Sequence, residues 1–72
     1  IPDTVTFIGE SAFRDCFSLK KVQINATSQL KTIGPNAFEK TSIEQILFPS
    51  KLTTVGDYAF YECFKLTEVE IK

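Results

Sequence analysis

The sequence of 72 residues contains no histidine and no methionine, and it has only two cysteines, three glycines and three prolines. The lack of histidine removes the side chain that most often serves as a catalytic base. No pair of acidic residues stands at a spacing useful for catalysis either, so the sequence predicts a non-enzymatic chain. The lack of methionine indicates a processed, synthetic or excised piece of a longer protein.

The sequence also lacks an excess of charge and a long apolar run. Eight basic and nine acidic residues give a net charge of −1, so nothing in the charge attracts nucleic acid or an anionic membrane. No apolar run is long enough to span a bilayer, and no signal-peptide pattern opens the chain. No D-x-D-x-D loop or phosphate-binding motif occurs. The sequence therefore predicts no nucleic-acid partner, no membrane insertion, no metal site and no cofactor.

What the sequence does contain is one pattern in three copies. The copies are VTFIGESAFRDCFSLKKVQI (residues 5–24), LKTIGPNAFEKTSIEQILF (30–48) and LTTVGDYAFYECFKLTEVEI (52–71). Their glycines, Gly9, Gly34 and Gly56, are 25 and 22 residues apart, and two small indels reconcile these spacings with one period. Such a period predicts a single stacked-repeat domain over residues 1–72, with repeats of approximately 1–24, 25–48 and 49–72.

Each copy predicts a strand, a turn and a short helix. Residues 21–24, 45–48 and 68–71 alternate between outward and inward positions, which is the pattern of a half-buried strand. A polar turn follows, and the second repeat has the longest one, residues 25–29. The glycine after the turn provides either a positive φ or a close backbone approach. A helix of one or two turns is expected next, with Pro35 at its first position.

No single repeat can bury its own apolar side chains, so we expect the repeats to stack with equivalent residues in contact. The strands then form a parallel sheet with neighbours ~4.8 Å apart. Stacked rings add ~0.5–1.5 kcal/mol per pair beyond burial. The predicted columns are Phe13, Phe38, Phe60 and Ile8, Ile33, Val55.

The pattern L-x-x-V-x-I followed by P-x-x-V-x-x-I-G-x-x-A-F-x-x-C resembles the BspA-type leucine-rich repeat. Ile/Val-Gly-x-x-Ala-Phe recurs three times in register, whereas Thr41 and Asn25 depart from the expected cysteine and proline. The resemblance implies an α/β repeat fold. This is a right-handed solenoid with a short parallel sheet on its concave face and short helical turns on its convex face. It further implies no catalytic residues, a surface or secreted location in microbes, and adhesion or host-protein binding.

The concave strand face is the usual binding surface of a solenoid. Its outward positions are occupied by Lys21, Gln23, Gln45, Leu47, Glu68 and Glu70. The charge changes from basic in the first repeat to acidic in the last, and Leu47 is the one apolar contact. We hypothesise a docking strip for a protein partner. The alternative is a solvated face on a repeat that serves only as a structural spacer within a larger protein.

Cys16 and Cys63 occupy equivalent positions two repeats apart. Two steps of ~4.8 Å exceed the ~7 Å that a disulfide allows between Cα atoms, so we expect no internal bridge. Without a histidine to activate them, buried packing thiols are a better interpretation than reactive ones.

Residues 25–27, Asn-Ala-Thr, match the acceptor sequence for N-glycosylation. The long turn that contains them has room for a glycan on Asn25. The alternative is a chance match in a polar turn.

Phe17 and Phe64, with Ser42 between them, are expected to form a second, broken column. The two ends of the chain are expected to expose apolar surface. Neither end of the chain carries a polar capping segment of the kind that keeps solenoids soluble. Open strand edges at uncapped ends invite association, so we expect the isolated chain to self-associate.

Overall fold

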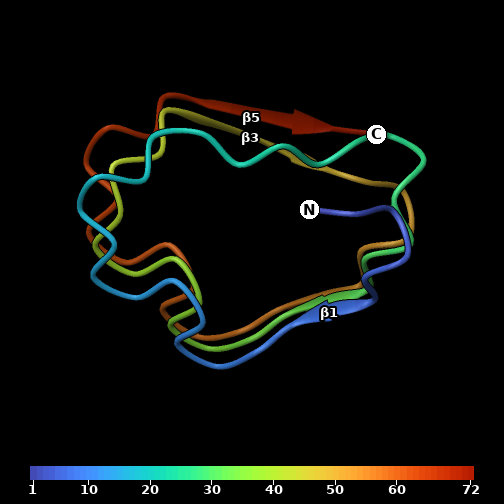
Figure 1. Cartoon of the computed structure of the whole chain (residues 1–72), viewed down its shortest axis with the longest axis horizontal. Coiled ribbons are helices and arrows are strands. Elements are labelled where there is room, and N and C mark those ends of the chain that lie inside the picture. Colours follow the sequence, from blue (N-terminus) through green and yellow to red (C-terminus); the bar gives the residue numbers. More distant parts are fainter.

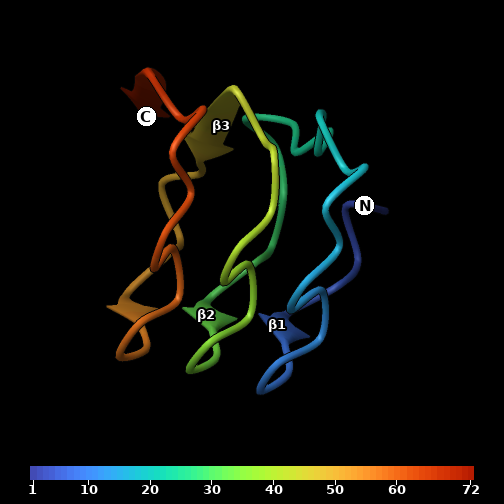
Figure 2. The same ribbon diagram turned by 90° about the vertical axis from the view of Figure 1, so that its left-hand side faces the viewer.

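The computed structural model describes all 72 residues, which wind into coils stacked along the shortest axis of the molecule (Figures 1 and 2). The dimensions along the principal axes are 27 × 21 × 17 Å. The secondary structure consists of five short strands and no helix. The strands are β1 (Phe7–Ile8), β2 (Thr32–Ile33), β3 (Gln45–Phe48), β4 (Thr54–Val55) and β5 (Glu68–Ile71).

One parallel sheet, in the order β1-β2-β4, joins all three repeats and was not predicted as strands. Its register pairs Ile8 with Ile33 and Ile33 with Val55, which confirms the column predicted for these residues. Each of its strands has only two residues, too few to display a period of two in the sequence. The sheet exists because equivalent residues of stacked coils lie side by side.

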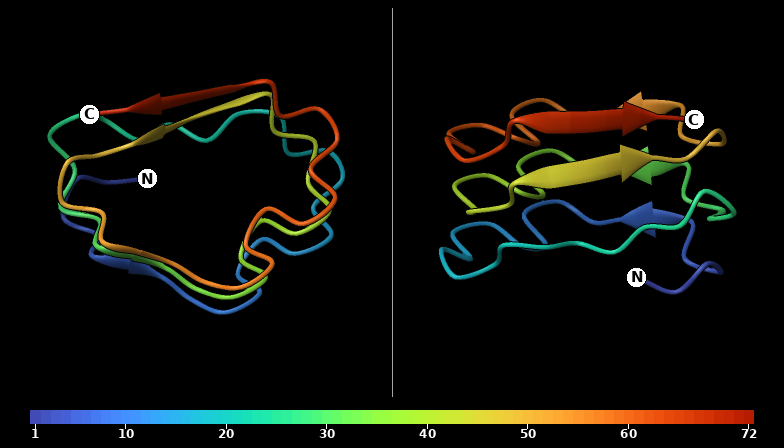
Figure 3. Two further views of the ribbon diagram at one scale, coloured as in Figure 1. Left: turned by 180° about the vertical axis from the view of Figure 1, so that it is seen from behind. Right: turned by 90° about the horizontal axis from the view of Figure 1, so that it is seen from above.

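The second parallel sheet contains β3 and β5 (Figure 3). Its register places Ile46 opposite Val69. The strand predicted for residues 21–24 of the first repeat does not form, and that part of the prediction is wrong. Glu44 N still donates to Lys20 O at 3.2 Å, but no backbone hydrogen bond joins residues 22–24 to β3. The sheet on this face therefore has two strands rather than three.

The long turn at residues 25–29 is held to the start of the chain. The Asp3 carboxylate accepts hydrogen bonds from Asn25 Nδ2 at 3.1 Å and from Thr27 Oγ1 at 2.6 Å. The Gln23 carbonyl accepts one from the amino group of Ile1 at 2.9 Å. The hydrogen bonds of this segment therefore join it to the first residues of the chain, and none joins residues 22–24 to β3.

The segment after each glycine is a series of turns, and the predicted short helices are wrong. A right-handed helix requires negative φ throughout, but the residues two and six positions after each glycine have positive φ. These residues, with φ between 56° and 63°, are Ser11, Asp15, Asn36, Lys40, Tyr58 and Glu62. Pro35 accordingly lies in a turn and not at the start of a helix.

The hydrogen-bond acceptors of the backbone N–H groups explain why turns replace helices here. Phe13 N donates to Ala37 O of the next coil at 2.7 Å, and Phe38 N donates to Ala59 O at 2.8 Å. In a helix each backbone N–H donates to a carbonyl of the same segment. In these turns every second N–H donates to a carbonyl of the neighbouring coil. The turn segments therefore hold the stack together much as the sheets do.

None of the glycines has a positive φ, so a left-handed backbone is not the reason for glycine here. The glycines instead allow neighbouring coils to approach closely. A Cβ atom on Gly34 would lie 2.8 Å from Glu10 N and 2.9 Å from Gly9 C of the preceding coil. A Cβ atom on Gly9 would meet only the Phe7 ring, at 3.7 Å. Of the two predicted roles of the glycine, close backbone approach is the one observed.

The core confirms the predicted aromatic column. The Phe38 ring stacks on Phe13 at 5.2 Å and on Phe60 at 5.4 Å, with interplanar angles of 9° and 10°. The buried core residues are Ile8, Ile24, Leu30, Ile33, Ala37, Phe38, Ile43, Ile46 and Ala59. Most of these come from the middle repeat, because only that repeat is covered on both sides.

The two outer coils expose apolar side chains and unpaired backbone groups. The N–H groups of Phe60 and Glu62 bond to no backbone carbonyl, although their equivalents in the first and middle coils do. Apolar side chains exposed on the outer coils include Phe7, Val55, Val69 and Ile71. Such surfaces are able to extend a stack with further chains.

We predict that the isolated 72-residue chain self-associates, because stacking a second chain on an outer coil buries these side chains and pairs these N–H groups. Sedimentation velocity at increasing concentration should show a rising sedimentation coefficient. A constant monomer value over the whole concentration range would contradict the prediction.

Candidate functional site

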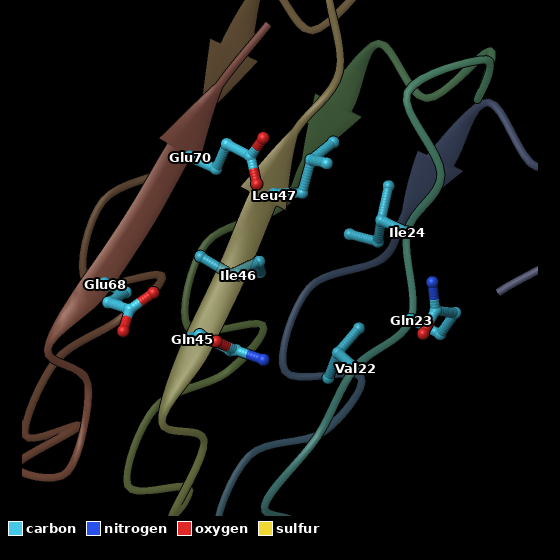
Figure 4. Close-up of a pocket in the computed structure, with 8 residues that line it drawn as sticks. All are labelled: Val22, Gln23, Ile24, Gln45, Ile46, Leu47, Glu68 and Glu70. Atoms are coloured by element: carbon cyan, nitrogen blue, oxygen red, sulfur yellow. The ribbon is translucent and has the colours of Figure 1, made fainter.

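The outward side chains of β3 and β5, namely Gln45, Leu47, Glu68 and Glu70, form what we call the β3–β5 face. A hollow of about 210 Å³ opens where this face meets residues 22–24 of the first repeat (Figure 4). The residues that line it are Val22, Gln23, Ile24, Gln45, Ile46, Leu47, Glu68 and Glu70.

The parallel register brings the polar side chains of this face together. Gln45 lies opposite Glu68, and Leu47 lies opposite Glu70, on neighbouring strands. Glu70 forms an ion pair with Lys72 (2.6 Å between Oε2 and Nζ), whereas Glu68 forms none. Leu47 is half-buried and packs against the core. The face therefore presents one amide group and one unpaired carboxylate around the Leu47 side chain.

Five of the six outward residues singled out in the sequence line the hollow, and Lys21 lies outside it although it is exposed. Sequence reasoning missed Val22, Ile24 and Ile46, which belong to the inward row of the predicted strands. They reach the hollow because residues 22–24 do not pair with β3. The longer turn at residues 25–29 was the one signal of this irregularity in the sequence.

The chemistry of this site is that of hydrogen bonding and charge. No group of three or more metal-ligating side chains occurs in the structure, and no helix is present that could cross a membrane. No buried side-chain polar atom lacks a hydrogen-bond partner.

A family model described as "BspA type Leucine rich repeat region (6 copies)" matches residues 1–72. The chain belongs to the BspA-type leucine-rich repeat family. The family is typically non-catalytic, and its repeat accounts for the short parallel strands of the structure.

Among solved structures, the chain is similar to a leucine-rich repeat protein from Bacteroides ovatus ATCC 8483, with 37% sequence identity and a TM-score of 0.89. The match covers 97% of this chain and 18% of that protein's chain. It supports the leucine-rich repeat solenoid for the whole of this chain. No curated protein matches the sequence.

The two cysteines occupy the cysteine position of the BspA-type repeat, and both are free thiols. Cys63 is half-buried, and its Sγ donates to Phe38 O of the preceding coil at 2.9 Å. Cys16 is exposed, so the prediction of a buried packing thiol is wrong for this residue. The reason is its place in the first coil, where no preceding coil covers it.

The Asn25 side chain is exposed, but hydrogen bonds within the turn hold it. Its Nδ2 donates to Asp3, and its Oδ1 accepts from Gln23 Nε2 at 3.2 Å. The Thr27 hydroxyl of the acceptor sequence is also engaged with Asp3. Glycosylation of Asn25 stays a prediction.

Proposed function

We propose that this chain is a non-catalytic protein-interaction module of a microbial surface or secreted leucine-rich repeat protein, with a role in adhesion or host-protein binding. Membership of the BspA-type family supports the class of function. The observation that carries the proposal is the hollow on the β3–β5 face, which gathers most of the outward strand residues beside four apolar side chains.

The chemistry of the hollow on this face favours a partner with donor groups. Glu68 and Glu70 supply carboxylate oxygens, and Gln23 and Gln45 supply amide groups beside the half-buried Leu47. We therefore expect a partner segment with lysine or arginine and one apolar side chain. The area that three repeats offer is small beside the ~800 Å² per partner of a stable interface, so this chain alone should bind weakly.

Substitution of the face tests the proposal. We predict that Glu68→Lys and Leu47→Ala, singly or together, lower partner affinity by at least about tenfold, the loss typical of an important interface residue. Glu10→Lys is the matched control for charge reversal, because Glu10 is an exposed glutamate outside both the face and the hollow. Host-cell surface proteins retained by the immobilised wild-type chain would be purified and titrated against each variant by surface plasmon resonance.

Denaturant unfolding of each variant separates loss of binding from loss of structure. Leu47 packs against the core, so Leu47→Ala should also cost about 1–2 kcal/mol of stability, whereas substitution of the exposed Glu68 should cost little. If the two single variants and the double variant all bind as well as the wild type, the face is not the binding surface. The structural spacer would then be the better account of this chain.

A further inference from the structure

The segment that leads from the phenylalanine column to the second sheet has two lengths. In the first and third repeats it contains an extra turn, closed by Leu19 N donating to Cys16 O at 3.0 Å and by Leu66 N donating to Cys63 O at 3.1 Å. The middle repeat is one residue shorter here and has no such turn. The loops of the outer repeats accordingly project further than that of the middle repeat, at the left of Figure 1.

Phe17 and Phe64 lie in these two projecting turns, and their exposed fractions are 67% and 83%. The middle repeat carries Ser42 at the equivalent position, and its Oγ donates to Phe17 O at 2.6 Å. A hollow of about 250 Å³ is lined by both phenylalanines together with Lys40 and Glu62. We call this hollow the phenylalanine notch.

The inner column of stacked rings indicates what the notch can hold. The steps from Phe13 to Phe38 and from Phe38 to Phe60 add up to 10.6 Å. Phe17 and Phe64 are likewise two coils apart, so we infer a similar separation of their rings, which leaves room for one ring between them at about 5.3 Å from each. Aromatic rings prefer centroid separations of about 4.5–7 Å, so an inserted ring would contact both phenylalanines favourably.

The charged residues of the notch also favour an aromatic occupant. Lys40 Nζ and Glu62 Oε1 are 3.8 Å apart, and both side chains are partly exposed. An ammonium group beside an inserted ring adds a cation–π contact, which is strongest for tryptophan. An aliphatic side chain would gain neither ring stacking nor this contact.

We propose that the phenylalanine notch binds an aromatic side chain of a partner polypeptide, in the position that Ser42 leaves empty in the second aromatic column. The notch lies at the loops that precede the second sheet and shares no lining residue with the hollow on the β3–β5 face. The proposal is therefore independent of the function proposed above.

The chain has no tryptophan, so tryptophan fluorescence reports on an added probe alone. We expect N-acetyl-tryptophanamide to show a saturable blue shift on titration with the protein. Phe64→Ser should weaken this binding by about tenfold, the value of one aromatic contact at its upper limit. Ser42→Phe should abolish binding, because the new ring occupies the notch from within.

Phe7→Ser is the matched control, since Phe7 is also an exposed phenylalanine, at 63%, but lies outside the notch. It should bind the probe as the wild type does. N-acetyl-leucinamide should not displace the probe. Denaturant unfolding of Phe64→Ser should match that of the wild type, because the removed side chain is largely exposed.

Three results would overturn the proposal. They are the absence of saturable binding, equal competition by N-acetyl-leucinamide, and full binding by Ser42→Phe with a native unfolding transition. Sedimentation adds a fourth test: if Phe64→Ser abolishes self-association of the chain, the occupant is a second copy and not a partner polypeptide.

Discussion

Replacement of Phe38 by alanine is expected to unfold most of the chain. The Phe38 ring is fully buried and is the central member of the stacked column, in contact with both Phe13 and Phe60. Truncation of a buried phenylalanine costs about 3–5 kcal/mol, through lost burial and the cavity that remains. A domain of this length has roughly 4–11 kcal/mol of stability in total. The loss is therefore a large part of what keeps the domain folded.

Urea unfolding followed by circular dichroism measures this effect. The midpoint for Phe38→Ala should fall far below that of the wild type, or the variant should lack a cooperative transition. Phe64→Ala removes the same ring at an exposed site. Its free energy of unfolding should stay within about 0.5 kcal/mol of that of the wild type, so its midpoint should change little. Equal midpoints for the two variants would show that the column does not carry the stability assigned to it.

Replacement of Gly34 by alanine is the second large expected effect. Its added Cβ would lie 3.0 Å or less from Glu10 N, Gly9 C and Ile8 O. These are backbone atoms, which cannot rotate away as a flexible side chain would. Overpacking of this kind costs about 1–3 kcal/mol, and we expect the upper end of the range because two coils must separate.

Gly9→Ala is the matched control, because the same substitution meets only the Phe7 ring at 3.7 Å. Neither glycine has a positive φ, so the backbone dihedral angles at both positions are open to alanine, and only the surroundings of the added Cβ differ. Gly9→Ala should then stabilise the chain by about 0.4–1 kcal/mol, since alanine lowers the entropy of the unfolded state. Opposite shifts of the urea midpoint are the expected result, and a loss of stability in both variants would contradict the close-approach role of Gly34.

Several features of the fold were predictable from particular residues. The recurrence of Ile/Val-Gly-x-x-Ala-Phe established the three repeats and the contact of equivalent side chains. It also predicted the Phe13–Phe38–Phe60 column, which the structure confirms. The outward positions of β3 and β5 followed from alternation, because a strand directs successive side chains to opposite faces.

Other features depended on contacts between coils that the sequence does not display. Donation from Phe13 N to Ala37 O replaces the predicted helix with turns, because a donor used between coils is lost to the helix. The segment at residues 21–24 does not pair with β3, although its residue pattern matches those of β3 and β5. Both outcomes depend on hydrogen bonds between coils, which local propensity does not predict.

The sequence by itself determined the repeat, the columns and the identity of the side chains on each face, because these depend only on the order of residue types. Only the tertiary structure decided where the surface is hollow. The hollow beside β3 arises where one strand fails to pair, and the phenylalanine notch arises where the middle repeat is one residue shorter. Each hollow results from a difference between neighbouring coils, and such a difference produces a hollow only when the coils are stacked.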